Sequence, residues 1–176
     1  MRRLWMLLAT LLASGTLMAQ AVDPYAGLRE SADGYAQVVP GRTFAFPADH
    51  LPHPDYRIEW WYVTGNLNDS AGRRWGVQWT LFRTQLAPGD DPGGWSSSQV
   101  WLAHAAITTP EGHRHARRHA RGGIGQAGVG LEQGRFGAWL DDWRWRGEGA
   151  EPFPGQLHFN VDGAQVALSM SAPTPF

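Results

Sequence analysis

Apolar residues gather in three strand-length runs in the first half of the chain, at residues 57–67, 73–86 and 99–108. In each run they alternate with polar residues or are nearly continuous, a pattern typical of β-strands. Turn-forming residues at 68–72 join the first two runs, which predicts a hairpin. The third run is followed by residues 109–112, with Pro110 and Gly112 at the places a type I turn prefers. A short first strand is predicted at 43–46.

The second half contains two further signals. Residues 139–146 predict one strand with a mostly indole face and a mostly charged face. The first face would hold Trp139, Asp141, Trp143 and Trp145, and the second Leu140, Asp142, Arg144 and Arg146. Asp162-Gly163 is the preferred two-residue hairpin turn, and its flanks predict the pairs Val161–Ala164, Phe159–Val166 and Leu157–Leu168. At least seven strands and no convincing helix indicate an all-β antiparallel barrel or sandwich; a closed barrel has the advantage of leaving no exposed edge.

The N-terminus reads as a secretory signal peptide. Arg2-Arg3 precede an apolar run at 4–12, and Ala19-Gln20-Ala21 supplies a small-x-small cleavage pattern. The run is too short for a membrane span, which needs about 20 apolar residues. We therefore expect residues 1–21 to be removed, residues 22–42 to form an extended lead-in, and residues 43–176 to form the β domain of a periplasmic or secreted protein.

Composition narrows the functional classes. The 10 Trp, 7 Phe and 4 Tyr beside 22 Gly and 12 Pro suit an aromatic-rich β protein with many turns. The net charge of −1 becomes more negative when Arg2 and Arg3 are removed, so nothing electrostatic favours nucleic acid. Without cysteine, stability must come from packing. No cofactor is expected.

Four local patterns bear on possible chemistry. Residues 123–128 match GxGxxG but lack a preceding strand and a following helix, so they predict a flexible loop. GxSxG is absent. His113, His115 and His119 lie among arginines, whose positive charge opposes zinc binding. This pattern therefore favours a solvated hairpin or an anionic contact surface over a zinc site. A second cluster favours a hydrogen-bonded loop anchor over a metal site; it comprises Asp49, His50, His53, Asp55 and Glu59.

Taken together, residues 44–108 resemble one family closely. The matching stretches are FPADH at 46–50, HP at 53–54, EWWY at 59–62, TGNL at 64–67, Gly72, GVQ at 76–78, TLFR at 80–83 and AHAA at 103–106. The pattern is similar to the N-terminal part of the AttH-like proteins, which are related to hydroxyneurosporene synthase, also called carotenoid 1,2-hydratase. Residues 139–145 and 162–163 match more loosely.

The resemblance implies a lipocalin-like β-barrel, usually the first of two, in an exported protein. Some members of the family are linked to ABC transporter components of the lipoprotein-releasing type. Against that pattern the chain is short, so a second barrel is expected to be missing and the chain to be truncated. Apolar residues on both faces of 73–86 and 99–108 agree with a missing partner surface.

Three functional hypotheses follow. The first is a binding module for a long apolar ligand, linked to an ABC transporter. The second is a hydratase or isomerase acting on an apolar alkene such as a carotenoid. Glu59, His104 or Asp55 would then donate the proton, and the tryptophans would stabilise a carbocation. A secreted hydrolase of unknown substrate is a further alternative. The third is that the aromatic residues only fill the core. No catalytic residue is assigned.

The predicted ligand-binding residues are Glu59, Trp60, Trp61, Tyr62, Gln78, Arg83 and His104. Each of three successive strands carries a bulky polar group in mid-run, where burial is costly unless the group is paired. Glu59 and Arg83 are the natural ion pair, and Gln78 and His104 are possible companions in the polar floor of an aromatic cavity. Which face of residues 57–67 points inward stays open, because a one-residue change of register exchanges the two faces.

Overall fold

The structure is a computed structural model that describes residues 32–173. The predicted signal peptide at 1–21 and the first part of the lead-in lie outside the described residues. The described part of the lead-in, 32–42, consists of turns and irregular backbone. Within the described residues, no helix has the length and apolar character that a membrane crossing requires.

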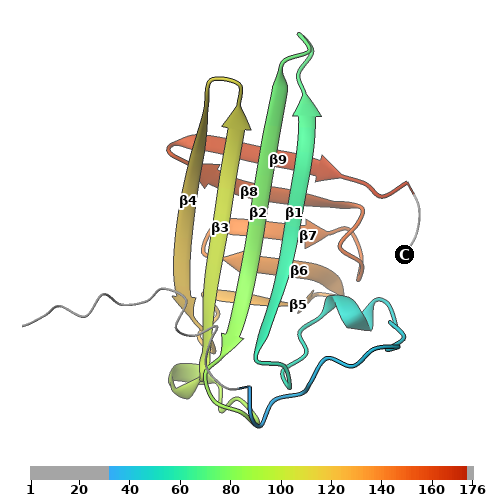
Figure 1. Cartoon of the computed structure of the whole chain (residues 1–176), viewed down its shortest axis with the longest axis vertical. Helices are drawn as coiled ribbons and strands as arrows, with labels where there is room; N and C mark the ends of the chain where they lie inside the picture. The colour runs from blue at the N-terminus through green and yellow to red at the C-terminus, as the bar shows by residue number, and fades with distance from the viewer. Residues whose placement is uncertain (1–31, 174–176) are drawn as a thin grey trace, which may run out of the picture. The chain divides into compact units, whose positions relative to one another are not determined.

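Within residues 32–173, nine strands form two antiparallel sheets (Figure 1). The first sheet has the order β1-β2-β3-β4, with β1 Ile58–Asn68, β2 Arg74–Gln85, β3 Gln99–Thr109 and β4 Gly112–Arg121. The second has the order β5-β6-β7-β8-β9, with β5 Ala127–Glu132, β6 Arg135–Leu140, β7 Trp143–Gly147, β8 Gly155–Val161 and β9 Ala164–Met170. Two short 3-10 helices, η1 Ala48–His50 and η2 Gly94–Ser96, lie in the connections.

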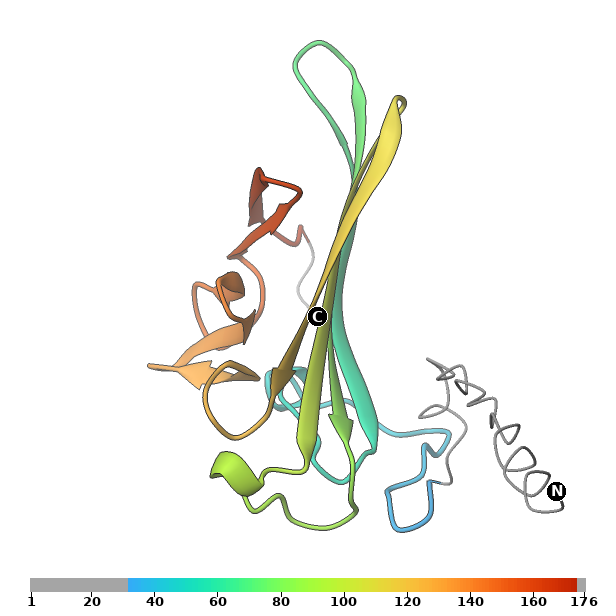
Figure 2. The same cartoon turned by 90° about the vertical axis from the view of Figure 1, so that its left-hand side faces the viewer.

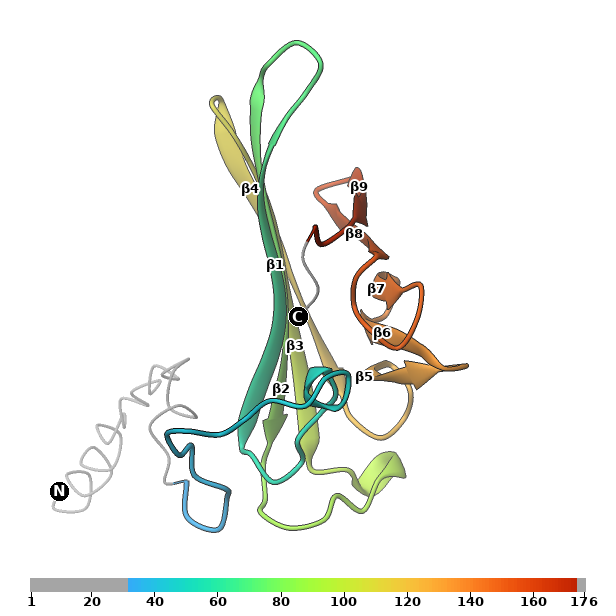
Figure 3. The ribbon, with the colours of Figure 1, turned by 90° about the vertical axis from the view of Figure 1, so that its right-hand side faces the viewer.

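The predicted all-β, antiparallel, lipocalin-like class is confirmed. Every pair of neighbouring strands is antiparallel. In the described part of the chain the sheets do not join into one closed barrel, because each keeps its own strand order. Instead they lie face to face as two layers (Figures 2 and 3), with the strands of the second running across those of the first (Figure 1).

The space between the layers is filled by large side chains. Trp79 and Leu81 of β2, Trp143 of β7 and Phe159 of β8 are almost completely buried there. The rings of Trp79 and Trp145 meet edge to face, with centroids 6.2 Å apart. Burying each such side chain contributes about 1.5–3 kcal/mol, so this interior is a packed core that holds the two sheets together.

The side chains of the first sheet divide cleanly between two faces. The ladder places odd-numbered residues of β1–β3 and even-numbered residues of β4 on one face, and these include the buried Val77, Trp79, Leu81, Trp101 and Ala103. We call this the inner face. The outer face carries the even-numbered residues of β1–β3 and the odd-numbered residues of β4.

The predicted C-terminal hairpin is confirmed in full register. Val161 pairs with Ala164, Phe159 with Val166 and Leu157 with Leu168. Asp162 and Gly163 have φ near +48° and +81°, as a type I′ turn requires. The predicted strands at 57–67, 73–86 and 99–108 are confirmed as β1, β2 and β3, within one residue at each end.

Two predicted strands are wrong. Residues 43–46 form no strand, because the backbone N–H of Ala45 and the side chain of Arg42 both bind the carboxylate of Asp49. Residues 139–146 are not one strand but the β6–β7 hairpin, in which Leu140 pairs with Trp143 and Asp141 has φ near +55°.

The hairpin also changes which of these tryptophans share a face. Trp143 and Trp145 enter the core, while Trp139 pairs with Arg144 on the opposite face. Residues 123–128, predicted to form a flexible loop, run into β5, which begins at Ala127, and the glycine-containing stretch that follows forms the rest of β5 and the start of β6.

Candidate functional site

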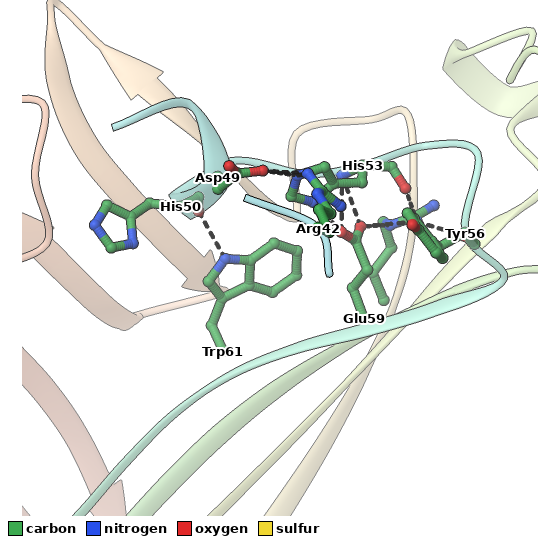
Figure 4. A network of polar contacts seen from close by, with 8 residues as sticks. Arg42, Asp49, His50, His53, Tyr56, Glu59 and Trp61 are labelled. Atoms are coloured by element: carbon green, nitrogen blue, oxygen red, sulfur yellow. Dashed lines mark hydrogen bonds and ion pairs between the residues drawn. The ribbon is translucent and has the colours of Figure 1, made fainter. Parts of the chain in front are cut away.

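A cluster of charged side chains lies where the irregular segment meets the start of β1; we call it the anchor cluster. Its members are Arg42, Asp49, His53, Glu59 and Arg83, most of them visible in Figure 4. His53 lies between two carboxylates, with Nδ1 2.7 Å from Glu59 Oε1 and Nε2 2.8 Å from Asp49 Oδ1. Hydrogen bonds from the Ala45 backbone N–H and from His53 hold the pKa of Asp49 below its usual range.

Glu59 and Arg83 form the predicted ion pair, and both side chains also make hydrogen bonds to the backbone of residues 53–56. They are directly opposite in the β1–β2 ladder, with Arg83 Nη2 2.8 Å from Glu59 Oε2. Arg83 is 1% exposed and donates to the carbonyl oxygens of His53 and Tyr56 at 2.9 and 2.7 Å. Glu59 also accepts from the backbone N–H of His53 at 2.8 Å. The pair therefore fastens the 53–56 loop to the sheet.

The other residues of the predicted loop cluster have structural contacts of their own. The indole N–H of Trp61 donates to the carbonyl oxygen of His50 at 2.8 Å (Figure 4). The His50 ring lies 2.7 Å from the carboxylate of Glu151, and the backbone carbonyl of Asp55 accepts from Ala36 at 2.9 Å. The geometry is that of a hydrogen-bonded loop anchor.

The structure does not bring the predicted ligand-binding residues together. Glu59, Trp61 and Arg83 lie on the inner face, whereas Trp60, Tyr62, Gln78 and His104 lie on the outer face. The single polar floor expected from the sequence is therefore wrong. The proposed proton donors are separated in the same way, because Glu59 belongs to the anchor cluster, His104 to the outer face and Asp55 to an exposed loop position.

The outer face carries exposed aromatic residues on regular strands. Trp60 and Tyr62 are 57% and 61% exposed. Across the sheet, Trp60 pairs with Phe82, which pairs with Leu102. We call Trp60, Tyr62, Phe82 and Leu102 the aromatic patch. The sequence prediction missed Phe82 and Leu102, although the apolar residues on both faces of β2 and β3 were a signal that could have identified them.

Beside the aromatic patch lies a groove of about 370 Å³. Its polar lining comes from β2, β3 and β4, namely Gln78, Thr80, His104, His113, His115 and Arg117. We call it the basic groove. The rings of Phe82 and His104 meet edge to face at 5.8 Å, so the patch and the groove adjoin. Partial desolvation and the positive charges of His119, Arg117 and His115 lower the pKa of His104, which stays exposed to solvent.

A second, larger groove of about 660 Å³ lies at the far ends of β1–β3. Gln78 lines both grooves. Of the predicted residues on the outer face, Gln78 and His104 line these grooves, whereas Trp60 and Tyr62 belong to the aromatic patch. The sequence prediction missed Arg117, although the histidine and arginine pattern of residues 113–121 had suggested an anionic contact surface.

The fold and these surfaces define an all-β, two-sheet protein of the lipocalin-like class. The AttH-like family model matches residues 37–176. The chain belongs to the AttH-like family, as its sequence pattern predicted.

A solved structure agrees with this assignment. It is the crystal structure, at 2.00 Å resolution, of a candidate AttH protein from Nitrosomonas europaea, 32% identical in sequence with a TM-score of 0.58. The match covers 78% of this chain and 41% of that protein, so this chain spans less than half of its relative. No curated protein matches the chain.

Proposed function

We propose that this AttH-type protein is exported and binds a long apolar ligand on the outer face of its first sheet. The observation that carries the proposal is the exposure of Trp60 and Tyr62 on a regular strand. Large aromatic side chains in such a position mark binding surfaces, because their contact with water is unfavourable and a ligand removes it. An exported carrier of this kind would exchange its ligand with an ABC transporter, as the family resemblance implies.

The packing of the interior also favours an external site. The residues between the sheets are large and closely packed, with Trp79, Leu81 and Trp143 at or near zero exposure. A ligand in that space would have to displace core side chains, which costs several kcal/mol for each large residue. The outer face needs no such rearrangement.

The test is titration with a neutral polyene ester whose absorption overlaps tryptophan emission. Energy transfer from the aromatic patch should report binding, and Trp60→Ala should raise the dissociation constant about tenfold, the effect of losing one well-packed indole. Trp95→Ala is the matched control, because Trp95 is 77% exposed on η2 and should leave affinity unchanged. Equal effects of the two substitutions, or no binding of the ester, would contradict the proposal.

A further inference from the structure

The outer face of the first sheet carries no carboxylate. None of the even-numbered positions of β1–β3 or the odd-numbered positions of β4 is Asp or Glu. The same face holds arginines and histidines, namely Arg74, His104, His113, His115, Arg117, His119 and Arg121. This segregation arises in a chain whose net charge is −1. The face is therefore complementary to an anion, unlike the protein as a whole.

The cationic groups border the aromatic patch in a fixed order. One row across the sheet runs Trp60–Phe82–Leu102–His119, and the next runs Tyr62–Thr80–His104–Arg117. Apolar side chains thus come from β1, β2 and β3, and positive charge comes from β4. A molecule lying across the strands meets apolar contacts at one end and cationic donors at the other.

We propose that the ligand is an amphiphile whose anionic headgroup, a carboxylate or a phosphate, binds in the basic groove. Its chain lies over the aromatic patch. The groove, at about 370 Å³, is large enough for a headgroup but not for a long chain as well. The Arg117 guanidinium supplies fixed positive charge, and charge-assisted hydrogen bonds to such anions are stronger than neutral ones. This inference rests on the proposed function and adds the chemical class of the ligand.

Binding should strengthen as pH falls. The pKa of His104 is lowered by partial desolvation and by the positive charges of His119, Arg117 and His115, so His104 takes up its proton only at a lower pH than an ordinary histidine. From β2, Thr80 and Phe82 face it, and neither carries charge. An anion in the groove offsets the repulsion and raises the pKa of His104, so proton and headgroup bind cooperatively.

The experiment measures displacement of the neutral polyene ester by probes of equal chain length. At neutral pH, hexadecanoate should bind about tenfold more tightly than hexadecanol, the scale of one charge-assisted hydrogen bond. Arg117→Gln should abolish that difference and leave hexadecanol unaffected. Arg135→Gln is the matched control, because Arg135 lines a groove formed by the second sheet. Between about pH 8 and 5.5, hexadecane sulfonate should gain affinity, and His104→Gln should remove part of the gain, because His113 and His115 also line the groove.

The outcomes separate this inference from the function on which it rests. Equal affinities for hexadecanoate and hexadecanol would overturn the headgroup site and leave the apolar binding function standing. Failure of both to bind would overturn both proposals. Butyrate or inorganic phosphate binding as tightly as hexadecanoate would show an anion site without a chain site, and would also overturn the inference. Phosphatidylglycerol and phosphatidylcholine vesicles then distinguish the sources. Where hexadecanoate binds, stronger and selective binding to phosphatidylglycerol vesicles assigns the headgroup to a bilayer lipid, and no preference between the two vesicles assigns it to a monomeric amphiphile.

Discussion

Replacing Glu59 with glutamine tests whether the anchor cluster is structural. The substitution preserves shape but removes the charge that faces Arg83, whose Nη2 lies 2.8 Å from Glu59 Oε2. It also places an amide that donates hydrogen bonds against groups that donate already, the His53 backbone N–H and Arg83 Nε. Arg83 then stays 1% exposed without a counter-charge.

The size of the effect follows from this burial. Breaking a buried ion pair by removing one partner costs about 3–5 kcal/mol. Arg83 keeps its bonds to the carbonyl oxygens of His53 and Tyr56, and the Glu59 side chain is 14% exposed, so we expect the lower end, about 3 kcal/mol. For a domain of this size that lowers the Tm by about 6–12 °C.

Urea unfolding followed by tryptophan fluorescence measures the change, with Glu132→Gln as the matched control. Glu132 pairs with Arg144 and Arg146 at 3.5 and 3.3 Å, with all three side chains at least 37% exposed. An exposed pair of this kind contributes about 0–1 kcal/mol. The reasoning is refuted if Glu59→Gln costs no more than the control, or if it changes ester affinity more than it changes stability.

Three further predictions concern the turn, the core and the N-terminus. Gly163→Val should lower the free energy of unfolding in urea by about 1–3 kcal/mol, because φ near +81° strains a β-branched residue. Gly112→Val is the control, since Gly112 lies in a hairpin without positive φ, and it should cost less. Equal costs would argue against the turn geometry. Trp143→Ala should cost about 3–5 kcal/mol, whereas Trp139→Ala, outside the core, should cost about 1 kcal/mol; similar values would argue for one continuous strand. Intact-mass measurement of exported protein should show cleavage after Ala21, and a stable product that retains residues 1–21 would contradict it.

Local sequence was sufficient where a few neighbouring residues determine the backbone. Asp162-Gly163 accepts positive φ at both turn positions, and this sets the register of the whole β8–β9 hairpin, including the Phe159–Val166 pair. The first three strands could be predicted for a similar reason, since their apolar runs end at turn-forming residues. The Glu59–Arg83 pair was also predictable, because each residue is costly to bury alone.

Tertiary structure decided which side chains share a face. In the EWWY segment, residues 59–62, either alternating set of side chains could face the core. Packing of the first sheet against the second placed Glu59 and Trp61 inside and Trp60 and Tyr62 outside. That choice separated the predicted ligand residues into an anchor and an exposed surface. It depends on contacts between segments far apart in sequence, which no local pattern encodes.

The β5–β6 hairpin is a second element that the local sequence did not predict. Residues 123–128 predicted a flexible loop, yet the last two of them, Ala127 and Gly128, belong to β5. In the folded protein Gly128 lies opposite Trp139, and a Cβ on Gly128 would lie 2.8 Å from that indole. The sequence alone thus determined the all-β class, the family pattern and the strongest turn. Pairing with Trp139 across the β5–β6 hairpin places Gly128 in a strand, and the three-dimensional structure shows this pairing.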